Sequence, residues 1–185
     1  KAGLKTSIIS KKQKTFNYDF VIIPGVGTFK SGMEVLRKNK YDEKLFNYLI
    51  KPNSFIYGIC LGMQLLFENS YEFGQTKGLG LIKGQILELN KKNKKLKTNT
   101  GWSKTKFLSY NRLGFEKFNN KHFYFVHSYY AKPKNDNETL AKTFHGNFSF
   151  ASAVKKDNIL GTQFHPEKSG NLGIEFLKNL KKLKI

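Results

Sequence analysis

Two short apolar segments of this sequence each run directly into a glycine-rich turn, and this pattern constrains the fold more than any other feature. Phe20–Ile23 is followed by Pro24-Gly25-Val26-Gly27, and Ser54–Tyr57 is followed by Gly58-Ile59-Cys60-Leu61-Gly62. Both apolar segments have the length of buried strands, and the residues after both turns have helical spacing. Strands that alternate with helices in this way predict an α/β domain with a mostly parallel central sheet.

The rest of the chain divides into a helical part before residue 81 and a β-rich part after it. Apolar spacing and helix-forming residues predict helices over Ser31–Asn39, Glu43–Ile50, Leu61–Glu68 and Leu172–Ile185. Apolar segments between Asn, Lys and Gly turns predict strands over Gly84–Leu89, Phe107–Tyr110, Phe123–Val126, Phe148–Val154 and Ile159–Phe164. The lysine-rich stretch Leu89–Lys106 predicts a solvated hairpin or loop. A length of 185 residues suits a single domain with its own core.

The net charge of +20 suggests a nucleic-acid partner, but the type of basic residue argues against one. Arg37 and Arg112 are the arginines of the sequence, and its other basic residues are lysines spread along the whole chain. Recognition of bases and phosphates relies on the bidentate guanidinium group more than on lysine. We therefore expect a solvated lysine surface and no nucleic-acid partner.

The residue content also excludes several classes of protein. An aromatic content of 15% argues against intrinsic disorder. No apolar run approaches the roughly 18 residues that a membrane helix needs, so we expect no membrane segment. The single cysteine, Cys60, excludes an internal disulfide and a cysteine-rich zinc site. Together with the absence of a secretory signal, it favours a cytoplasmic location.

The second turn places this cysteine where a catalytic nucleophile is often found. Gly58-Ile59-Cys60-Leu61-Gly62 is the thiol form of the G-x-S-x-G nucleophile elbow, with a strand before it and a helix after it. Such a turn holds the nucleophile in a strained conformation that bulky neighbours would obstruct, which explains the two glycines. The helix N-terminus favours a thiolate, and the Leu61 N–H can donate to a developing oxyanion. A nucleophilic Cys60 is therefore favoured over a buried structural cysteine.

A catalytic thiolate needs a base, and the chain has four histidines. His165 follows an apolar strand and lies two residues before Glu167. Because alternate strand residues share a side, Glu167 can orient the His165 ring, although a structural ion pair at the strand end is an alternative. The other histidines, of which His127 is the next best candidate, have no acid nearby or lie in polar stretches. The sequence thus predicts a triad of Cys60, His165 and Glu167.

Four motifs, taken together, resemble those of the class I, or triad, glutamine amidotransferases. In chain order they are Pro24–Gly27, Gly58–Gln64, Tyr124–Tyr129 and Gln163–Ser169. The resemblance spans nearly the whole chain. It implies a flavodoxin-like fold, with helices on both faces of a mostly parallel central sheet and added antiparallel strands in the second half. Within the family, the chain looks most like the glutaminase subunits of imidazole glycerol phosphate synthases, which serve histidine biosynthesis.

The resemblance implies a role for each residue of the reaction centre. Cys60 would be the nucleophile, His165 the base and acid, and Glu167 the residue that orients His165. The backbone N–H groups of Gly27 and Leu61 would stabilise the oxyanion. The implied reaction is attack of the thiolate on the side-chain amide of L-glutamine, release of ammonia, and hydrolysis of a glutamyl thioester. It uses no metal and no cofactor.

The resemblance also implies a substrate pocket and a partner. Gln64, Ser128 and Tyr129 would line the glutamine pocket. Subunits of this kind pass ammonia to a (β/α)₈-barrel synthase, or cyclase, subunit in a heterodimer. We expect Trp102 and Lys168 to contact that partner, because one is a large aromatic residue and the other directly follows the triad acid.

Two departures from the family pattern leave alternatives open. The usual first strand is absent, since the chain begins at Lys1 with what looks like a helix end and a strand over Thr6–Ser10. We therefore expect one amidotransferase domain over residues 1–185 that lacks this strand. Thr98–Ser103 replaces the Pro-His-Met-Gly-Trp-Asn segment that is usual in the histidine pathway. This leaves open a paralogous subunit that supplies ammonia for amidino-sugar (surface polysaccharide) biosynthesis, besides a basic binding module or another cysteine hydrolase.

Overall fold

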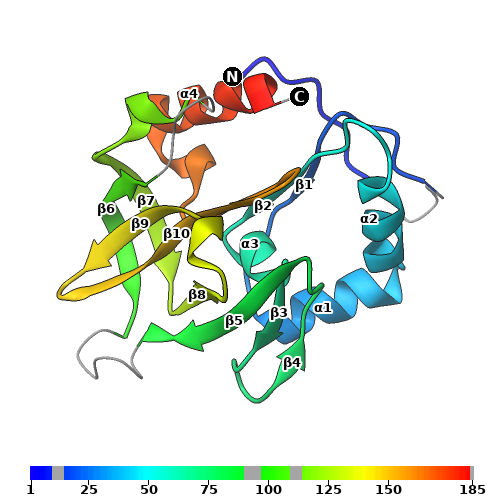
Figure 1. Ribbon diagram of the computed structural model, residues 1–185, viewed down its shortest axis with the longest axis horizontal. Coiled ribbons are helices and arrows are strands. Elements are labelled where there is room, and N and C mark those ends of the chain that lie inside the picture. The colour runs from blue at the N-terminus through cyan, green and yellow to red at the C-terminus, as the bar shows by residue number, and fades with distance from the viewer. Residues whose placement is uncertain (10–14, 90–96, 109–113, 184–185) are drawn as a thin grey trace.

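The computed structural model describes residues 1–9, 15–89, 97–108 and 114–183, and within them the strands form an eleven-stranded sheet (Figure 1). In sheet order, the main path consists of β1 (Val21–Ile23), β2 (Ile56–Ile59), β11 (Ile159–Thr162), β10 (Phe148–Lys156), β8 (Tyr129–Pro133), β5 (Ile82–Glu88), β3 (Phe67–Ser70) and β4 (Thr76–Lys77). A branch joins β10 and consists of β9 (Thr139–His145), β6 (Asn99–Phe107) and β7 (Lys121–His127). The α-helices are α1 (Phe29–Lys38), α2 (Tyr41–Leu49), α3 (Leu61–Leu65) and α4 (Gly170–Asn179). Short 3₁₀ helices span Glu116–Phe118, Asp136–Glu138, Pro166–Lys168 and Leu180–Leu183.

The sheet is parallel where the strand–turn–helix segments form it and mainly antiparallel elsewhere. β2 lies between β1 and β11 and is parallel to both, and β3 is parallel to β5. β10 is antiparallel to β8, β9 and β11, and β6 is antiparallel to β7 and β9. The second half therefore adds antiparallel strands, as predicted, and the sheet as a whole is mixed.

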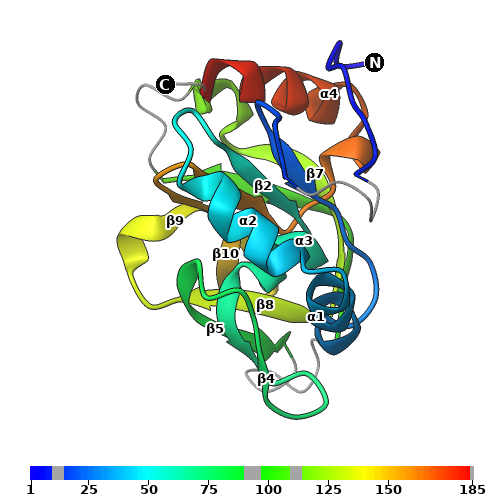
Figure 2. The ribbon, with the colours of Figure 1, turned by 90° about the vertical axis from the view of Figure 1, so that its right-hand side faces the viewer.

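Helices cover both faces of the sheet, and each face has its own apolar core (Figure 2). In β2, Ile56 belongs to the core shared with α1, α2 and α3, and its neighbour Tyr57 belongs to the core shared with α4. The two-residue period of a strand produces this division. Phe176 of α4 lies in a cluster of phenylalanines and stacks on Phe115 with 5.4 Å between ring centroids. No helix in the described ranges is long and apolar enough to cross a membrane.

The carboxyl ends of β1, β2 and β11 lie side by side at one edge of the sheet. The register pairs Ile23 of β1 with Gly58 of β2, and Thr162 of β11 with Ile59 of β2. Because parallel strands end at the same edge, the segments that follow them meet there. The turn 24–27, the cysteine elbow and the segment after β11 therefore converge, although they are far apart in the sequence.

The helix predicted over Leu61–Glu68 is wrong in its second half. α3 ends at Leu65, and β3 begins at Phe67. Phe67 pairs with Ile82 of β5 in a parallel ladder and is fully buried. Pairing within the sheet outweighs helix propensity here, because a helix of one or two turns gains little stability from propensity alone.

The solvated hairpin or loop predicted over Leu89–Lys106 is wrong in part, since residues 99–107 form β6, which pairs with β7 and β9. Lys104 and Lys106 are exposed, whereas Thr105 and Phe107 are buried, so β6 has one solvated face and one core face. Sequence analysis missed this strand because it interpreted the lysines as part of a solvated loop, whereas they occupy the solvent-facing positions of an alternating strand. Residues 90–96, which hold most of the lysine run, lie outside the described residues.

Further expectations about elements need correction. Residues 6–9 form no strand, because β1 is the edge of the described sheet and no described strand pairs with its outer side. Of the strand predicted over Phe107–Tyr110, Phe107 is the last residue of β6, and residues 109–110 lie outside the described part. The final helix ends at Asn179 and continues as a 3₁₀ helix to Leu183. β8 and β9 were not predicted. β8 pairs with β5 and β10, which are distant in the sequence, whereas β9 and β10 form a hairpin across Gly146 and Asn147, a local turn signal that sequence analysis missed.

The close approach of α3 to β1 gives a stability prediction. A Cβ at Gly62 would overlap the backbone carbonyl of Ile23, whereas a Cβ at Gly74 would meet nothing within 4 Å. We expect Gly62→Ala to lower the free energy of unfolding by about 3 kcal/mol or more, because backbone would have to move. Gly74→Ala should lower the free energy of unfolding by about 1–2 kcal/mol, because the positive φ at this position is its only obstacle to a side chain. Urea unfolding followed by circular dichroism measures both, and equal losses would contradict the close approach.

Candidate active site

Cys60 occupies the turn between β2 and α3 in a backbone conformation that few residues adopt. Its φ is 52° and its ψ is −109°, a strained combination for a residue with a side chain. The Cys60 N–H donates to the Thr162 carbonyl of β11 at 2.7 Å. A Cβ at Gly58 would lie 2.6 Å from the carbonyl oxygen of Gly62, so the turn requires glycine there. The strained strand-to-helix turn that the glycine spacing predicts is therefore present.

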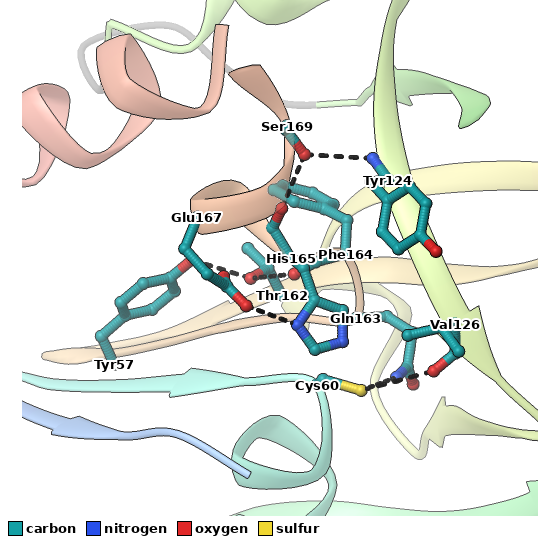
Figure 3. A network of polar contacts seen from close by, with 10 residues as sticks. All are labelled: Tyr57, Cys60, Tyr124, Val126, Thr162, Gln163, Phe164, His165, Glu167 and Ser169. Carbon is teal, nitrogen blue, oxygen red and sulfur yellow. Dashed lines mark hydrogen bonds and ion pairs between the residues drawn. The ribbon is translucent and has the colours of Figure 1, made fainter. Parts of the chain in front are cut away.

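The Cys60 sulfur lies among polar groups even though the residue is 7% exposed. Gln163 Nε2 donates to Sγ at 3.5 Å, and the Val126 carbonyl oxygen lies 3.9 Å from Sγ (Figure 3). A thiol can donate to that carbonyl, whereas a thiolate accepts from the amide. Both protonation states of the sulfur therefore have a polar neighbour.

The imidazole ring of His165 lies between the Glu167 carboxylate and the Cys60 sulfur (Figure 3). His165 Nδ1 is 2.7 Å from Glu167 Oε1. The other ring nitrogen, Nε2, is buried and has no hydrogen-bond partner among the described residues. It is thus available to exchange a proton with the sulfur or with a molecule bound there.

Nearby charges favour the protonated form of His165. Burial lowers the pKa of His165, but the proximity of Cys60 and Glu167 outweighs burial and raises the pKa to about 9. Burial also opposes ionisation of Glu167, yet its hydrogen bond with His165 and the charge of Lys168 hold the pKa of this carboxyl below its ordinary value. At neutral pH the imidazole is therefore protonated.

Hydrogen bonds hold the backbone of His165 against β7. The His165 N–H donates to the Tyr124 carbonyl at 2.9 Å. The Ser169 hydroxyl donates to the His165 carbonyl at 2.7 Å and accepts from the Tyr124 N–H at 3.0 Å. Ser169 is 1% exposed, so these bonds are shielded from water. The histidine is thus held by its backbone on one side and by a carboxylate on its ring.

A second set of buried hydrogen bonds supports the end of β11. Thr162 Oγ1 donates to the Phe164 carbonyl at 3.1 Å and lies 2.8 Å from the Tyr57 hydroxyl. Because the threonine proton is used on the carbonyl, the Tyr57 hydroxyl is the donor to Thr162. Burial raises the pKa of Tyr57, which keeps this donor protonated.

His127, the second-choice histidine of the sequence analysis, is a neutral structural residue. Burial lowers its pKa to about 4. His127 Nδ1 is 2.8 Å from the Tyr129 carbonyl oxygen, and Nε2 is 3.1 Å from Asn99 Nδ2. Nδ1 therefore donates and Nε2 accepts, which leaves neither nitrogen for proton transfer at Cys60.

A cavity of about 400 Å³ opens over the sulfur. It is lined by Val26, Gly27, Thr28, Cys60, Leu61, Gln64, Glu72, Phe73, Val126, His127, Ser128, Tyr129 and His165. The five residues that sequence analysis assigned to the oxyanion and the substrate pocket are all among them. In the described part of the chain, no group of three or more His, Cys, Asp or Glu side chains is placed to hold a metal ion.

The cavity wall has polar groups of fixed orientation. Gln64 Nε2 donates to the Tyr129 carbonyl and to Gln163 Oε1, each at 3.0 Å. The Leu61 N–H is the first of α3 and has no carbonyl within the helix to bond. Gly27, with a φ of 105°, has open space where a Cβ would be.

Sequence analysis missed Glu72 of the cavity wall. Glu72 is 9% exposed, and its Oε2 accepts from the Phe29 N–H at the start of α1. It lies in the loop after β3, and the first half of β3, residues 67–68, was predicted as helix. A buried acid beside a polar cavity is a signal only once the fold is known.

Trp102 and Lys168 do not line the cavity, and both neighbour the same residue, Tyr124. Both contact the ring of Tyr124: Trp102 packs edge-on with 6.1 Å between centroids, and Lys168 Nζ is 5.9 Å from the ring centroid. Trp102 is 57% exposed, which rules out the core position that a lone tryptophan often has. Tyr124 and Val126 share one face of β7, and Val126 also lines the cavity. Trp102, Tyr124, Lys168 and Val126 therefore form a surface, here called the aromatic surface, that continues to the cavity.

Comparison with known proteins decides the family. The family model "Glutamine amidotransferase class-I" matches residues 3–182. The chain belongs to this family. This amidotransferase is 44% identical over 188 residues to the imidazole glycerol phosphate synthase subunit HisH of Sulfurimonas denitrificans, covering 98% of this chain and 88% of the relative. It is 40% identical over 179 residues to the HisH subunit of Methanocaldococcus jannaschii, covering 97% and 88%. The HisH subunit of Chlorobaculum tepidum is 37% identical over 177 residues, covering 96% and 87%.

Solved structures confirm the fold of the amidotransferase. A crystal structure of a glutamine amidotransferase matches with a TM-score of 0.66 at 15% identity, covering 90% of this chain and 80% of that chain. A glutamine amidotransferase from Thermotoga maritima matches with a TM-score of 0.57 at 19% identity, covering 91% and 66%. The family and the fold that the sequence motifs indicate are both confirmed.

The raised pKa of His165 predicts how stability depends on pH. Between pH 6.5, its ordinary pKa, and about 9, the folded protein keeps a proton on His165 that the unfolded chain releases. The free energy of unfolding should therefore fall as pH rises through this window. Because Glu167 helps to raise the pKa, Glu167→Gln should reduce the fall, while Glu175→Gln at an exposed site should not. Urea unfolding at a series of pH values measures this, and equal slopes for Glu167→Gln and the unchanged protein would contradict it.

Proposed function

We propose that this chain is the glutaminase subunit of an imidazole glycerol phosphate synthase, which hydrolyses L-glutamine and supplies ammonia for histidine biosynthesis. The observation that carries the proposal is the Cys60–His165–Glu167 arrangement at a 400 Å³ cavity. The names of relatives 37–44% identical over nearly the whole chain support the pathway and do not favour the amidino-sugar alternative. The match of the family model to residues 3–182 supports a single amidotransferase domain over residues 1–185. A biosynthetic subunit of this kind would act in the cytoplasm, where its thiol stays reduced.

In the first half of the proposed reaction, Cys60 reacts as a thiolate beside the protonated His165, and the sulfur attacks the δ-carbon of glutamine. A carbon–sulfur bond forms, and the carbonyl oxygen becomes an oxyanion. The N–H groups of Gly27 and Leu61, which both line the cavity, would donate to that oxygen. The carbon–nitrogen bond then breaks, His165 protonates the leaving nitrogen, and ammonia departs.

In the second half, water hydrolyses the thioester. His165 takes a proton from the attacking water, and the oxyanion forms again. Its collapse breaks the carbon–sulfur bond and releases glutamate, with the Cys60 thiolate as leaving group. Glu167 would hold the ring in one tautomer and stabilise the imidazolium in both halves.

The cavity wall supports an amino acid as substrate. Glu72 uses one carboxylate oxygen on the Phe29 N–H, and its other oxygen can pair with the ammonium group of glutamine. Gln64 uses Nε2 on Tyr129 and Gln163, so its Oε1 can accept from the same ammonium. Ser128 lines the same wall and adds a hydroxyl. These groups would hold the substrate while its amide reaches the sulfur.

The aromatic surface of Trp102, Tyr124, Lys168 and Val126 supports a partner subunit. It begins at the cavity and is exposed at Trp102, which suits a contact that covers the site. The subunit names of the relatives imply a synthase partner, and we propose a (β/α)₈-barrel subunit that receives the ammonia. His165 is bonded through its backbone to Tyr124, so this surface is one contact away from the catalytic base.

The nucleophile can be tested directly. Cys60→Ser should abolish glutamine hydrolysis, because an alcohol in this position is a far weaker nucleophile than a thiolate. A chloroketone analogue of glutamine should label the unchanged protein once, since Cys60 is the sole cysteine, and should not label the variant. Mass spectrometry and an ammonia-release assay measure the two effects, and normal turnover by folded Cys60→Ser would refute the proposal.

The partner surface gives a second test. Glutamine hydrolysis should rise when a barrel synthase subunit is added, because a free glutaminase would waste glutamine. Trp102→Ala and Lys168→Ala should each weaken the rise at limiting partner concentration by about tenfold, as expected for interface anchors. Phe46→Ala removes an exposed aromatic residue of α2 and is the matched control. Equal rates with and without the partner, or equal effects of all three variants, would contradict this assignment.

A further inference from the structure

We propose that the Gln163 side chain stabilises the Cys60 thiolate and couples it to the substrate-binding residue Gln64. This role rests on the proposed glutaminase function: Gln163 would act directly on the sulfur and would position Gln64. Sequence analysis used Gln163 only as the first residue of a motif and gave it no task.

The position of Gln163 is fixed by burial and by its backbone. Gln163 directly follows β11 and is completely buried. Its N–H donates to the Ser152 carbonyl of β10 at 2.9 Å. Its side chain ends between the sulfur, at 3.5 Å from Nε2, and Gln64, whose Nε2 is 3.0 Å from Gln163 Oε1. A buried amide that makes these two contacts joins the nucleophile to the cavity wall.

A backbone carbonyl sets the direction of this chain of hydrogen bonds. The Tyr129 carbonyl can only accept, so the Gln64 atom that contacts it at 3.0 Å must be the amide nitrogen. That nitrogen also contacts Gln163, which must therefore present its oxygen to Gln64. The Gln163 nitrogen is left to face the sulfur. The sulfur thus receives an N–H donor, and the amide cannot be reversed without losing a buried hydrogen bond.

An N–H donor favours the charged form of the sulfur. A thiolate is a much stronger acceptor than a thiol or a thioester, because a full negative charge strengthens the hydrogen bond. The donor therefore helps to hold Cys60 as the attacking thiolate, and it helps again when hydrolysis expels Cys60 as a thiolate. It requires no group beyond those present.

The same amide keeps Gln64 in one orientation. With both Nε2 protons used on Tyr129 and Gln163, Gln64 directs its oxygen elsewhere, and the residue lines the cavity. Loss of the Gln163 oxygen would let the Gln64 amide rotate and offer N–H groups to a substrate ammonium, which repels them. Gln163 should thus affect substrate binding as well as the sulfur.

The test measures alkylation of Cys60 by iodoacetamide as a function of pH. Because the chain has one cysteine, the rate reports Cys60 alone, and iodoacetamide needs no glutamine site. Gln163→Met keeps the length of the side chain and removes donor and acceptor. We expect its half-maximal rate at a pH higher by about one unit, the size expected for losing a hydrogen bond to a charged group. Ser152→Ala is the matched control: it removes a buried hydroxyl without a described partner, retains the backbone bond to Gln163, and should leave the midpoint unchanged.

The result of the alkylation test can be interpreted whether or not the proposed glutaminase function is correct. An unchanged midpoint in folded Gln163→Met would overturn the inference, even if glutamine hydrolysis is normal in the unchanged chain. A raised midpoint would support it whether or not the chain hydrolyses glutamine. With glutamine as substrate, the variant should also have a higher KM, and its kcat should recover as pH rises, which a merely structural defect would not produce.

Should Gln163→Met fail to fold, the unchanged protein offers a second measurement. The side-chain amide signals of Gln163, observed by nuclear magnetic resonance, should shift with pH at the same midpoint as the alkylation rate. This follows because the amide proton contacts the atom that titrates. Signals that stay constant through that midpoint would overturn the inference.

Discussion

The contact between the backbones of β1, β2 and α3 is the constraint on which the rest of the structure depends. Gly58 and Gly62 allow it, since a side chain at either position would overlap backbone atoms. The strain of the Cys60 conformation costs about 1–3 kcal/mol. Burial of Met63 and Leu65, at 0% and 3% exposure, offsets that cost, because each buried side chain of this size contributes about 1.5–3 kcal/mol. Although α3 is short, its buried side chains and the close backbone contact at Gly62 pack it against the sheet, with Cys60 at its N-terminus.

At the candidate active site, backbone hydrogen bonds join the segments that follow β2 and β11 to neighbouring strands. Cys60 after β2 donates to Thr162 of β11, and His165 donates to Tyr124 of β7. These backbone bonds place the proposed nucleophile and base, and the Gln163 amide would influence the protonation of the sulfur. The proposed base is bonded through its backbone to Tyr124 of the exposed surface, so binding of the proposed partner there would act on the site through β7.

Surface charge contributes little to the stability of this fold, despite its size. Apart from the triad pair, the described ion pairs join Glu175 to Lys117 and Lys178, with about half of each side chain exposed, and exposed pairs contribute about 0–1 kcal/mol. The phenylalanine cluster around Phe176 and the apolar core under α1–α3 stabilise the fold far more, because they remove apolar surface from water. Ion pairs of the described lysines therefore contribute little to the stability of the fold.

The sequence by itself determined the strand–turn–helix units, the family and the predicted triad, because their signals are local. Glycine spacing around Cys60 and the two-residue spacing of His165 and Glu167 depend only on neighbours in the chain. Only the tertiary structure decided that residues 99–107 form a strand, since their lysines face solvent on a sheet whose partners are distant in sequence. It also decided the placement of Glu72 and the direction of the Gln163 amide. Burial and hydrogen-bond direction depend on which distant groups lie opposite, and those groups meet only after the sheet has formed.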